Sequence, residues 1–219
     1  MFALPLLSLL LATMAFAAPS HKGRDAVPAS ALKLPSGQTQ LVAPTTAPKF
    51  VAAGFGNQNY SCTAGGNYTS IGAVAQLFDI SPLFGTPEFS TIQDDGFAIW
   101  SSCPSTDPFE KGLAPRLSEK FRIKPLGQHI FINFNGALSP KFDFTQTTGN
   151  PDNFVVAVKA GNIPAPASQD VDWLELKKVD GGLADLVFRV DTKAGKPPST
   201  CTPGSGPITV KYAAAYWFF

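Results

Sequence analysis

Residues 208–219 read ITVKYAAAYWFF, and apolar side chains recur at every second position of this segment. Successive side chains of an extended strand point to opposite faces, so the alternation gives the segment one continuous apolar face. That face consists of Ile208, Val210, Tyr212, Ala214, Tyr216 and Phe218, with Thr209 and Lys211 on the other side. The pattern predicts a C-terminal β-strand that packs this face against the core.

Other segments upstream have strand length and are rich in β-branched and aromatic residues, with Gly, Pro, Asn, Asp and Ser between them. They are residues 73–80, 97–100, 129–134, 154–160, 171–179 and 183–190. The sequence VDGG at 179–182 predicts a hairpin turn, because Asp-Gly and Gly-Gly tolerate positive φ. No segment shows a long apolar stripe at the helical period.

We therefore predict an all-β fold with a single domain at residues 34–219. Seven or more short strands separated by turns indicate an antiparallel β-sandwich or a barrel-like fold. Residues 101–123 are rich in proline and charge, which predicts a long Pro-rich loop with a helical turn at 117–121.

The segment FVAAGFGNQNYSC (residues 50–62) resembles the start of a dinucleotide-binding loop, because Gly54 and Gly56 follow an apolar entry. Such a loop needs a third glycine at the position that Asn59 occupies, and it needs a helix immediately afterwards. We interpret the segment instead as a strand in which the glycines permit a bulge or a close approach of backbone. The sequence predicts no cofactor.

The chain opens with a continuous apolar run that carries no charged side chain and ends in small residues at positions 15 and 17. This arrangement predicts a signal peptide at residues 1–17, cleaved after Ala17, and hence a secreted protein of the extracellular space or cell wall. Residues 18–33 are polar and small, which predicts a flexible lead-in. No segment has the length of a membrane anchor.

Charge and composition narrow the range of partners. The formal net charge is +1, which gives no reason to expect nucleic acid as a partner. Charged residues make up 15% of the chain and phenylalanine is abundant, which suits an aromatic core. The three tryptophans, Trp100, Trp173 and Trp217, lie in strand-like segments, so we assign them to the core rather than to a sugar-stacking surface.

Three cysteines, Cys62, Cys103 and Cys201, follow the signal peptide, and in an oxidising compartment at least two of them should pair. The residues alone leave all three pairings open. Two acceptor sequons, at Asn59 and Asn67, flank the first cysteine and predict a glycosylated surface region.

Candidate catalytic residues are few. The chain has two histidines, and His129 is the one outside the predicted lead-in. The cysteines lack metal-ligand spacing, so no metal site is predicted, and there is no Gly-x-Ser-x-Gly elbow or phosphate loop. The weak candidates for acid–base chemistry are His129 with Asp79 or Asp172, although no spacing brings these residues together.

Six motifs occur in order along the chain: GFGNQNYSC, GAVAQLFDIS, PLGQHIF, VDWLELKKVDGG, FRVDTKAGKPPSTC and VKYAAAYWFF. Together they resemble the secreted, mostly fungal proteins grouped as domain of unknown function 3455. The resemblance implies no established activity. Some members carry a malate dehydrogenase label, and the missing glycine motif, the absence of α/β alternation and the predicted signal peptide argue against that activity for this chain.

The chain departs from the family pattern at three places. Pro82 stands where the family has a cysteine, Gln128-His129 stands where the family has two histidines, and Asp172 replaces a proline. The resemblance favours pairing of Cys62 with Cys201, because both follow strand–turn patterns shared with the family. Cys103, which lies in the atypical loop, is the alternative partner for either.

We expect a secreted, non-catalytic protein with a surface, matrix or ligand-binding role. Its expected partner is an extracellular ligand, for which a glycan or cell-wall material is the candidate. The alternative is a secreted hydrolase that uses carboxylates together with His129. The absence of a complete nucleophile, metal or cofactor motif favours the first interpretation.

Overall fold

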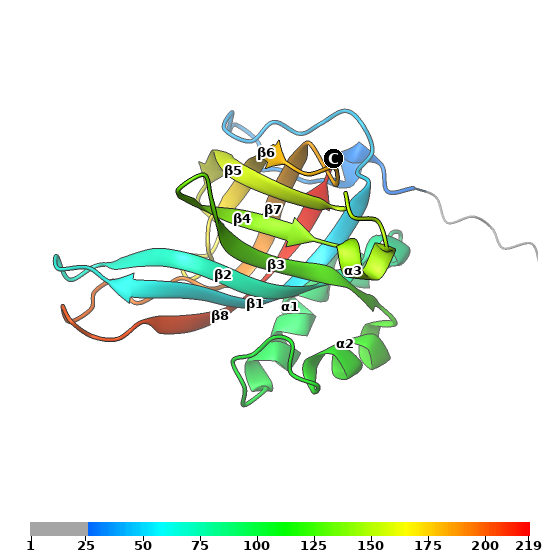
Figure 1. Cartoon of the computed structure of the whole chain (residues 1–219). Helices are drawn as coiled ribbons and strands as arrows, with labels where there is room; N and C mark the ends of the chain where they lie inside the picture. The colour runs from blue at the N-terminus through cyan, green and yellow to red at the C-terminus, as the bar shows by residue number, and fades with distance from the viewer. Residues whose placement is uncertain (1–25) are drawn as a thin grey trace, which may run out of the picture.

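The computed structural model describes residues 26–219, and eight antiparallel strands form a closed barrel at its centre (Figure 1). Each strand pairs with the next along the chain, and the last strand pairs with the first. The strands are β1 (Phe50–Cys62), β2 (Tyr68–Asp79), β3 (Lys124–Phe134), β4 (Ala137–Asp143), β5 (Phe154–Ile163), β6 (Trp173–Asp180), β7 (Leu186–Ala194) and β8 (Ile208–Phe218). The predicted single-domain, all-β antiparallel fold is confirmed, as a barrel.

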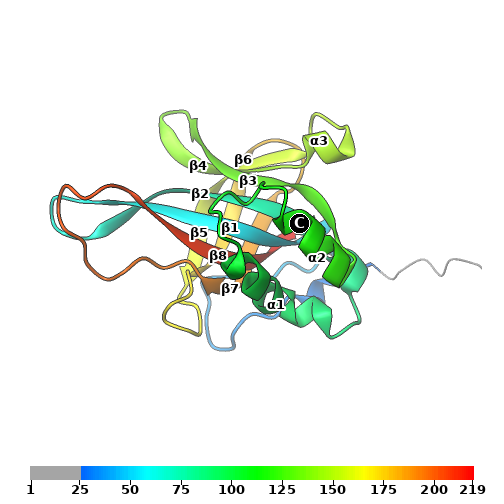
Figure 2. The same ribbon diagram turned by 90° about the horizontal axis from the view of Figure 1, so that it is seen from below.

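The helices lie outside the barrel. They are α1 (Glu88–Ser102), α2 (Leu113–Phe121) and α3 (Thr145–Thr148), with 3₁₀ turns η1 (Ala29–Ala31) and η2 (Ser81–Leu83). Figure 2 shows α1 and α2 together on the side of the barrel formed by β1 and β8. The chain between β2 and β3 therefore covers this wall of the barrel.

Strand β8 is buried on both faces from Tyr212 onward, which differs from the predicted single apolar face. Its even-numbered side chains from Tyr212 to Phe218 point into the barrel. Its odd-numbered side chains from Ala213 to Trp217, together with the terminal Phe219, join a second apolar cluster between the barrel wall and the outer layer. The alternation of apolar residues predicted the strand correctly. It did not predict burial of the face that carries Ala213, Ala215 and Trp217.

Strand β1 contains the two glycines of the apparent nucleotide loop, and it confirms the prediction of a strand. A Cβ atom at Gly56 would lie 2.0 Å from the carbonyl oxygen of Val74 on β2, so only glycine fits there. This is the close backbone approach that the glycines were predicted to permit, whereas the register of β1 and β2 shifts further along, between Asn59 and Tyr60. The Trp100 indole N–H donates to the Gly56 carbonyl at 2.7 Å and ties α1 to this strand.

Residues 97–100, predicted as a strand, lie in helix α1, so that prediction is wrong. The helix turns Ile92, Gly96 and Trp100 toward the barrel at four-residue spacing, and the glycine and neighbouring polar residues obscure the stripe. The predicted loop at 101–123 contains all of α2. Its buried side chains, Leu113, Leu117 and Phe121, again follow four-residue spacing, so the predicted helical turn is the last part of a longer helix.

The predicted signal peptide and residues 18–25 of the predicted lead-in lie outside the described residues. From residue 26 on, Val27 and Leu32 are buried in the outer apolar cluster. Further along, the backbone N–H of Val42 donates to the Glu175 carboxylate on β6 at 2.9 Å. Packing therefore extends closer to the N-terminus than the predicted boundary at residue 34. None of the helices within residues 26–219 is long and apolar enough to cross a membrane.

Candidate functional site

A cavity of about 530 Å³ opens at one end of the barrel. All eight strands contribute side chains to its lining, and these lie at the end that carries the β1–β2, β3–β4 and β5–β6 turns. The opposite end is filled by aromatic rings: Phe144 packs edge to face against both Phe50 and Phe218. The barrel is thus solid at one end and hollow at the other.

The cavity lies beside the point where β4 and β5 separate. Their ladder pairs only residues 141–143 with residues 154–156. Pro140 is the next residue toward the open end, and it has no N–H to continue the ladder. Strand β5 shifts its register with β6 directly after Val156. Both Pro140 and Ala157 line the cavity, so the local sequence of these two strands explains why the wall opens here.

Much of the cavity wall is apolar. The apolar side chains include Phe131, Leu138, Phe142, Val158, Leu174 and Leu176. Two of them, Leu138 on β4 and Val158 on β5, are 53% and 43% exposed, so apolar surface continues to the mouth. Such a surface holds an apolar group of a ligand without strong directional preference.

His129 lies against the inner part of this wall. Its ring stacks on Phe142 with a centroid distance of 4.3 Å, and its Nδ1 lies 3.1 Å from the Lys141 carbonyl oxygen. A carbonyl only accepts, so Nδ1 carries the proton and Nε2 does not. Burial lowers the pKa of His129 to about 3, with the hydrogen bond to Lys141 opposing that shift. The imidazole is therefore neutral at physiological pH.

A pair of tyrosines lies next to the histidine. The hydroxyl groups of Tyr212 and Tyr216 are 2.8 Å apart, and both side chains are fully buried. Burial raises the pKa of each phenol, so both stay protonated. Tyr216 lines the cavity, and its ring centroid is 5.7 Å from that of His129. The positive charge of Arg189 acts on the Tyr216 pKa in the opposite direction to burial.

Arg189 reaches the cavity from β7. Its Nε and Nη2 atoms donate to the backbone carbonyl of Asp172 at 3.2 and 2.8 Å, which holds the guanidinium in place. The Asp172 carboxylate is engaged elsewhere: Asn162 donates to it at 3.2 Å, and Lys196 lies 3.4 Å away. The arginine is thus oriented by a backbone group rather than neutralised by a carboxylate.

Of the three candidate catalytic residues, His129 and Asp172 line the same cavity and Asp79 does not. Asp79 pairs in register with Lys124 near the solid end of the barrel, and its carboxylate accepts from the Ser81 backbone N–H at 2.9 Å. Asp172 is the one carboxylate side chain among the residues that line the cavity.

Arg189 and Tyr216 are site residues that the sequence patterns did not identify. A signal for the first was present, since Arg189 interrupts the otherwise apolar segment LVFRV at 186–190. Its neighbours Phe188 and Val190 face the outer cluster, which leaves the arginine on the inward face. A lone charge on the inner face of a barrel strand indicates a polar function inside.

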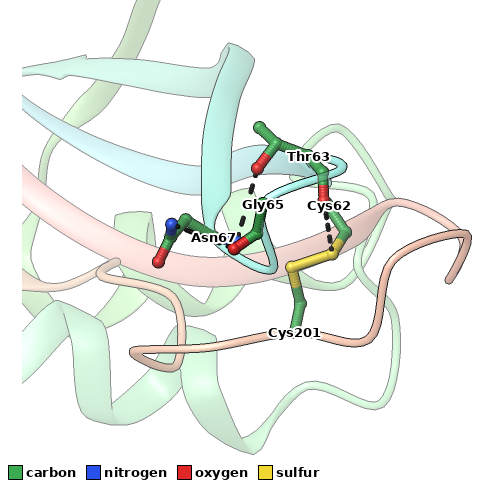
Figure 3. Close-up of a disulfide and its surroundings, with 5 residues drawn as sticks. All are labelled: Cys62, Thr63, Gly65, Asn67 and Cys201. Carbon is green, nitrogen blue, oxygen red and sulfur yellow. Dashed lines mark hydrogen bonds between the residues drawn. A yellow bond between two sulfur atoms is a disulfide. The ribbon is translucent and has the colours of Figure 1, made fainter.

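The predicted disulfide between Cys62 and Cys201 is confirmed, and Figure 3 shows it beside the β1–β2 turn. This turn lies at the open end of the barrel. It joins the end of β1 to the loop before β8. Cys103 is a free thiol at the end of α1, where the Arg116 guanidinium donates to its sulfur at 3.2 Å. Of the two sequon residues, Asn67 is exposed in the β1–β2 turn and Asn59 is partly buried within β1.

The described part of the chain contains no cluster of three or more His, Cys, Asp or Glu side chains that could hold a metal ion. The three tryptophans lie in the outer apolar cluster, as expected for core residues. The aromatic rings that do face the cavity belong to Tyr60, Phe131, Phe142 and Tyr216, together with the His129 imidazole.

These features define an up-and-down eight-stranded barrel with an internal cavity, an architecture that can hold one small ligand. Residues 43–219 match the model of the family described as "Protein of unknown function (DUF3455)", and the chain belongs to that family. No curated protein matches the chain. No solved structure matches it either.

Proposed function

We propose that this protein binds a small, largely apolar molecule in the barrel cavity and does not catalyse a reaction. The observation that carries the proposal is the cavity of about 530 Å³ lined from every strand of the barrel. Its volume falls in the range of about 300–1,000 Å³ typical of sites for small ligands, and its wall combines apolar surface with a few convergent polar groups.

The chemistry of the polar groups supports binding over hydrolysis. A carboxylate pair needs two acidic side chains flanking the bond to be broken, and Asp172 is alone among the lining residues. A general acid near neutral pH needs a pKa close to that pH, whereas burial holds the pKa of His129 at about 3. The hydrolase is therefore the second candidate.

We also propose that the protein is exported and acts outside the cell or in its wall. The signal-peptide pattern at residues 1–17, the disulfide and the exposed sequon at Asn67 support export. Sequencing of the secreted form should find an N-terminus near Ala18 and a glycan at Asn67. Recovery of the protein only from cytosol with Met1 intact would contradict the proposal.

Binding can be tested with a neutral apolar dye such as N-phenylnaphthylamine, whose fluorescence rises on burial. Val158 lines the cavity and Val179 does not, yet their exposed fractions, 43% and 44%, are matched. Val158→Asp should weaken dye binding by about tenfold, because a charge replaces apolar contact surface. Val179→Asp should bind the dye as the parent protein does.

The competing functions have their own readouts. A screen with hydrolase substrates should show no turnover, and turnover that Asp172→Asn abolishes would overturn the proposal in favour of the hydrolase. A glycan array tests the expected carbohydrate ligand. Glycan binding that Val158→Asp leaves unchanged would place the functional site outside the barrel.

A further inference from the structure

The most unusual group in the cavity is Arg189, a guanidinium inside a barrel. It is partly buried, and none of the ion pairs among residues 26–219 includes it. A guanidinium carries five N–H groups, and the Asp172 carbonyl takes one from Nε and one from Nη2. Three N–H groups therefore remain for a ligand or for the nearby Tyr216 hydroxyl.

The charges around the cavity have an excess of positive sign. Arg189, Lys159 and Lys196 line it, and Asp172 is the one acidic residue that does. The Asp172 carboxylate already has Lys196 beside it at 3.4 Å. The neutral His129 contributes no charge. A partly buried cation without a counter-ion is unfavourable, and an anion placed on it restores the balance.

The polar groups are also grouped in space. Arg189, Tyr216 and His129 meet at the inner part of the cavity, whereas the apolar side chains continue to the mouth at Leu138 and Val158. A guanidinium recognises a carboxylate through two parallel N–H bonds, and a tyrosine hydroxyl can add a third. The apolar wall then accommodates the remainder of such a molecule.

We infer that the ligand is a small organic acid, with its carboxylate on Arg189 and Tyr216 and its apolar body along the wall toward the mouth. This inference rests on the proposed binding function and adds the chemical class of the ligand. The Asp172 backbone carbonyl has a positioning role, because it accepts two hydrogen bonds from Arg189 and so fixes the orientation of the guanidinium.

A matched pair of probes tests the inference: decanoate and decanol share one apolar chain and differ in the head group. Their Kd values are measured near neutral pH by displacement of N-phenylnaphthylamine. The parent protein should bind decanoate at least about tenfold more tightly than decanol, because the carboxylate accepts charge-assisted hydrogen bonds that a hydroxyl group does not. Arg189→Met should abolish this preference and leave the Kd of decanol within about twofold.

The control variant is Lys177→Met, which removes an exposed charge from β6 outside the cavity lining. It should retain the preference for decanoate. Should Arg189→Met fail to fold, Arg189→Lys keeps the charge but loses the planar fork, and the preference should fall by about tenfold. Circular dichroism and cooperative unfolding identify the folded variants.

The outcomes separate the two proposals. If the parent protein binds decanol, decanoate and the dye equally well, the acid-binding inference is overturned and the barrel remains a binding site. If the preference for decanoate survives in the Arg189 variants, the carboxylate lies elsewhere and the inference is again overturned. Failure of all three probes to bind would count against the proposed function itself.

Discussion

The buried His129 side chain makes the stability of the barrel depend on pH. Burial holds its pKa near 3, against 6.5 for an exposed histidine, so the unfolded chain binds a proton over this interval and the native protein does not. Stability is therefore complete above about pH 6.5 and is lost progressively as pH falls toward about 3. The loss amounts to a few kcal/mol in total, because a pKa difference of about one between the two states corresponds to about 1.4 kcal/mol.

The variant His129→Phe tests this coupling. Phenylalanine keeps an aromatic ring against Phe142, and it loses the hydrogen bond to the Lys141 carbonyl, at a cost of about 1 kcal/mol near neutral pH. Its free energy of unfolding should then fall less steeply on acidification than that of the parent. Urea denaturation at a series of pH values measures both slopes. Equal slopes would show that His129 does not titrate as described.

Asp191 has the opposite dependence on pH. Burial, with a further contribution from the Asp94 charge, raises its pKa to about 6, so the native protein binds the proton more readily than the unfolded chain. Above pH 6 the native protein carries a buried charge at Asp191, which lowers the free energy of unfolding. As pH falls from about 6 to the ordinary aspartate pKa of 3.8, protonation of Asp191 removes this loss.

Asp191→Asn should therefore stabilise the protein above pH 6 by about 1–2 kcal/mol, and the gain should vanish near pH 4. Asparagine also tolerates the left-handed backbone at this residue, where φ is 47°. Thermal unfolding of parent and variant at both pH values checks the prediction. A gain that is the same at both pH values would mean that the removed charge is not its cause.

At the scale of single elements, α1 lies unusually close to the barrel. A Cβ atom at Gly96 would come within 2.3 Å of the Phe55 ring on β1, and that ring is fully buried. The close approach also brings Lys211 of β8 to the end of the helix, where its Nζ donates to the Trp100 carbonyl at 3.0 Å. This contact satisfies a terminal carbonyl of the helix with a cation.

Gly96→Ala should lower the free energy of unfolding by about 1–3 kcal/mol, although alanine favours helices over glycine. The reason is that the helix or the Phe55 ring must move to make room. Gly112→Ala is the matched control, because no atom lies within 4 Å of its added Cβ and its φ is −86°. The control should change stability by less than about 0.5 kcal/mol. Equal effects in the two variants would refute the steric argument.

Most elements could be predicted where the sequence carries a strong local pattern. Residues 208–219 alternate cleanly, and residues 181–185, which begin with the two glycines of the predicted turn, join β6 to its antiparallel neighbour β7. Strand β4 was missed because Pro140 and Lys141 interrupt its apolar residues, and α1 was missed because glycine occupies the centre of its buried stripe. In both cases contacts with neighbouring elements override the local signal.

For the molecule as a whole, the disulfide joins the end of β1 to the loop before β8, and its two cysteines lie 139 residues apart in sequence. Cys62→Ser combined with Cys201→Ser should lower the free energy of unfolding by about 2–4 kcal/mol, because the unfolded chain gains the freedom of a long loop. Chemical denaturation measures the loss. Cys103→Ser is the control and should leave stability within about 1 kcal/mol, since this free thiol is only partly buried.

The cavity is a property of the whole barrel, which is why local patterns could not reveal it. His129 and Asp172 were predicted as candidates because their side chains can carry out acid–base chemistry. They come to line one cavity only through the closure of all eight strands. The position of Arg189 on the inward face depends on register, and register shifts occur in four of the strand pairings, where spacing in the sequence does not predict them.

The short ladder between β4 and β5 should make this part of the barrel open locally more often than the rest. Three register pairs hold these strands together, whereas β1 and β8 share eleven and are covered on both sides. Amide protons of β1 and β8 should exchange with solvent only through global unfolding, and those next to Pro140 through brief local opening. Local opening beside the cavity and global unfolding are then separate events, so the rate of amide exchange next to Pro140 and the melting temperature of the protein can vary independently.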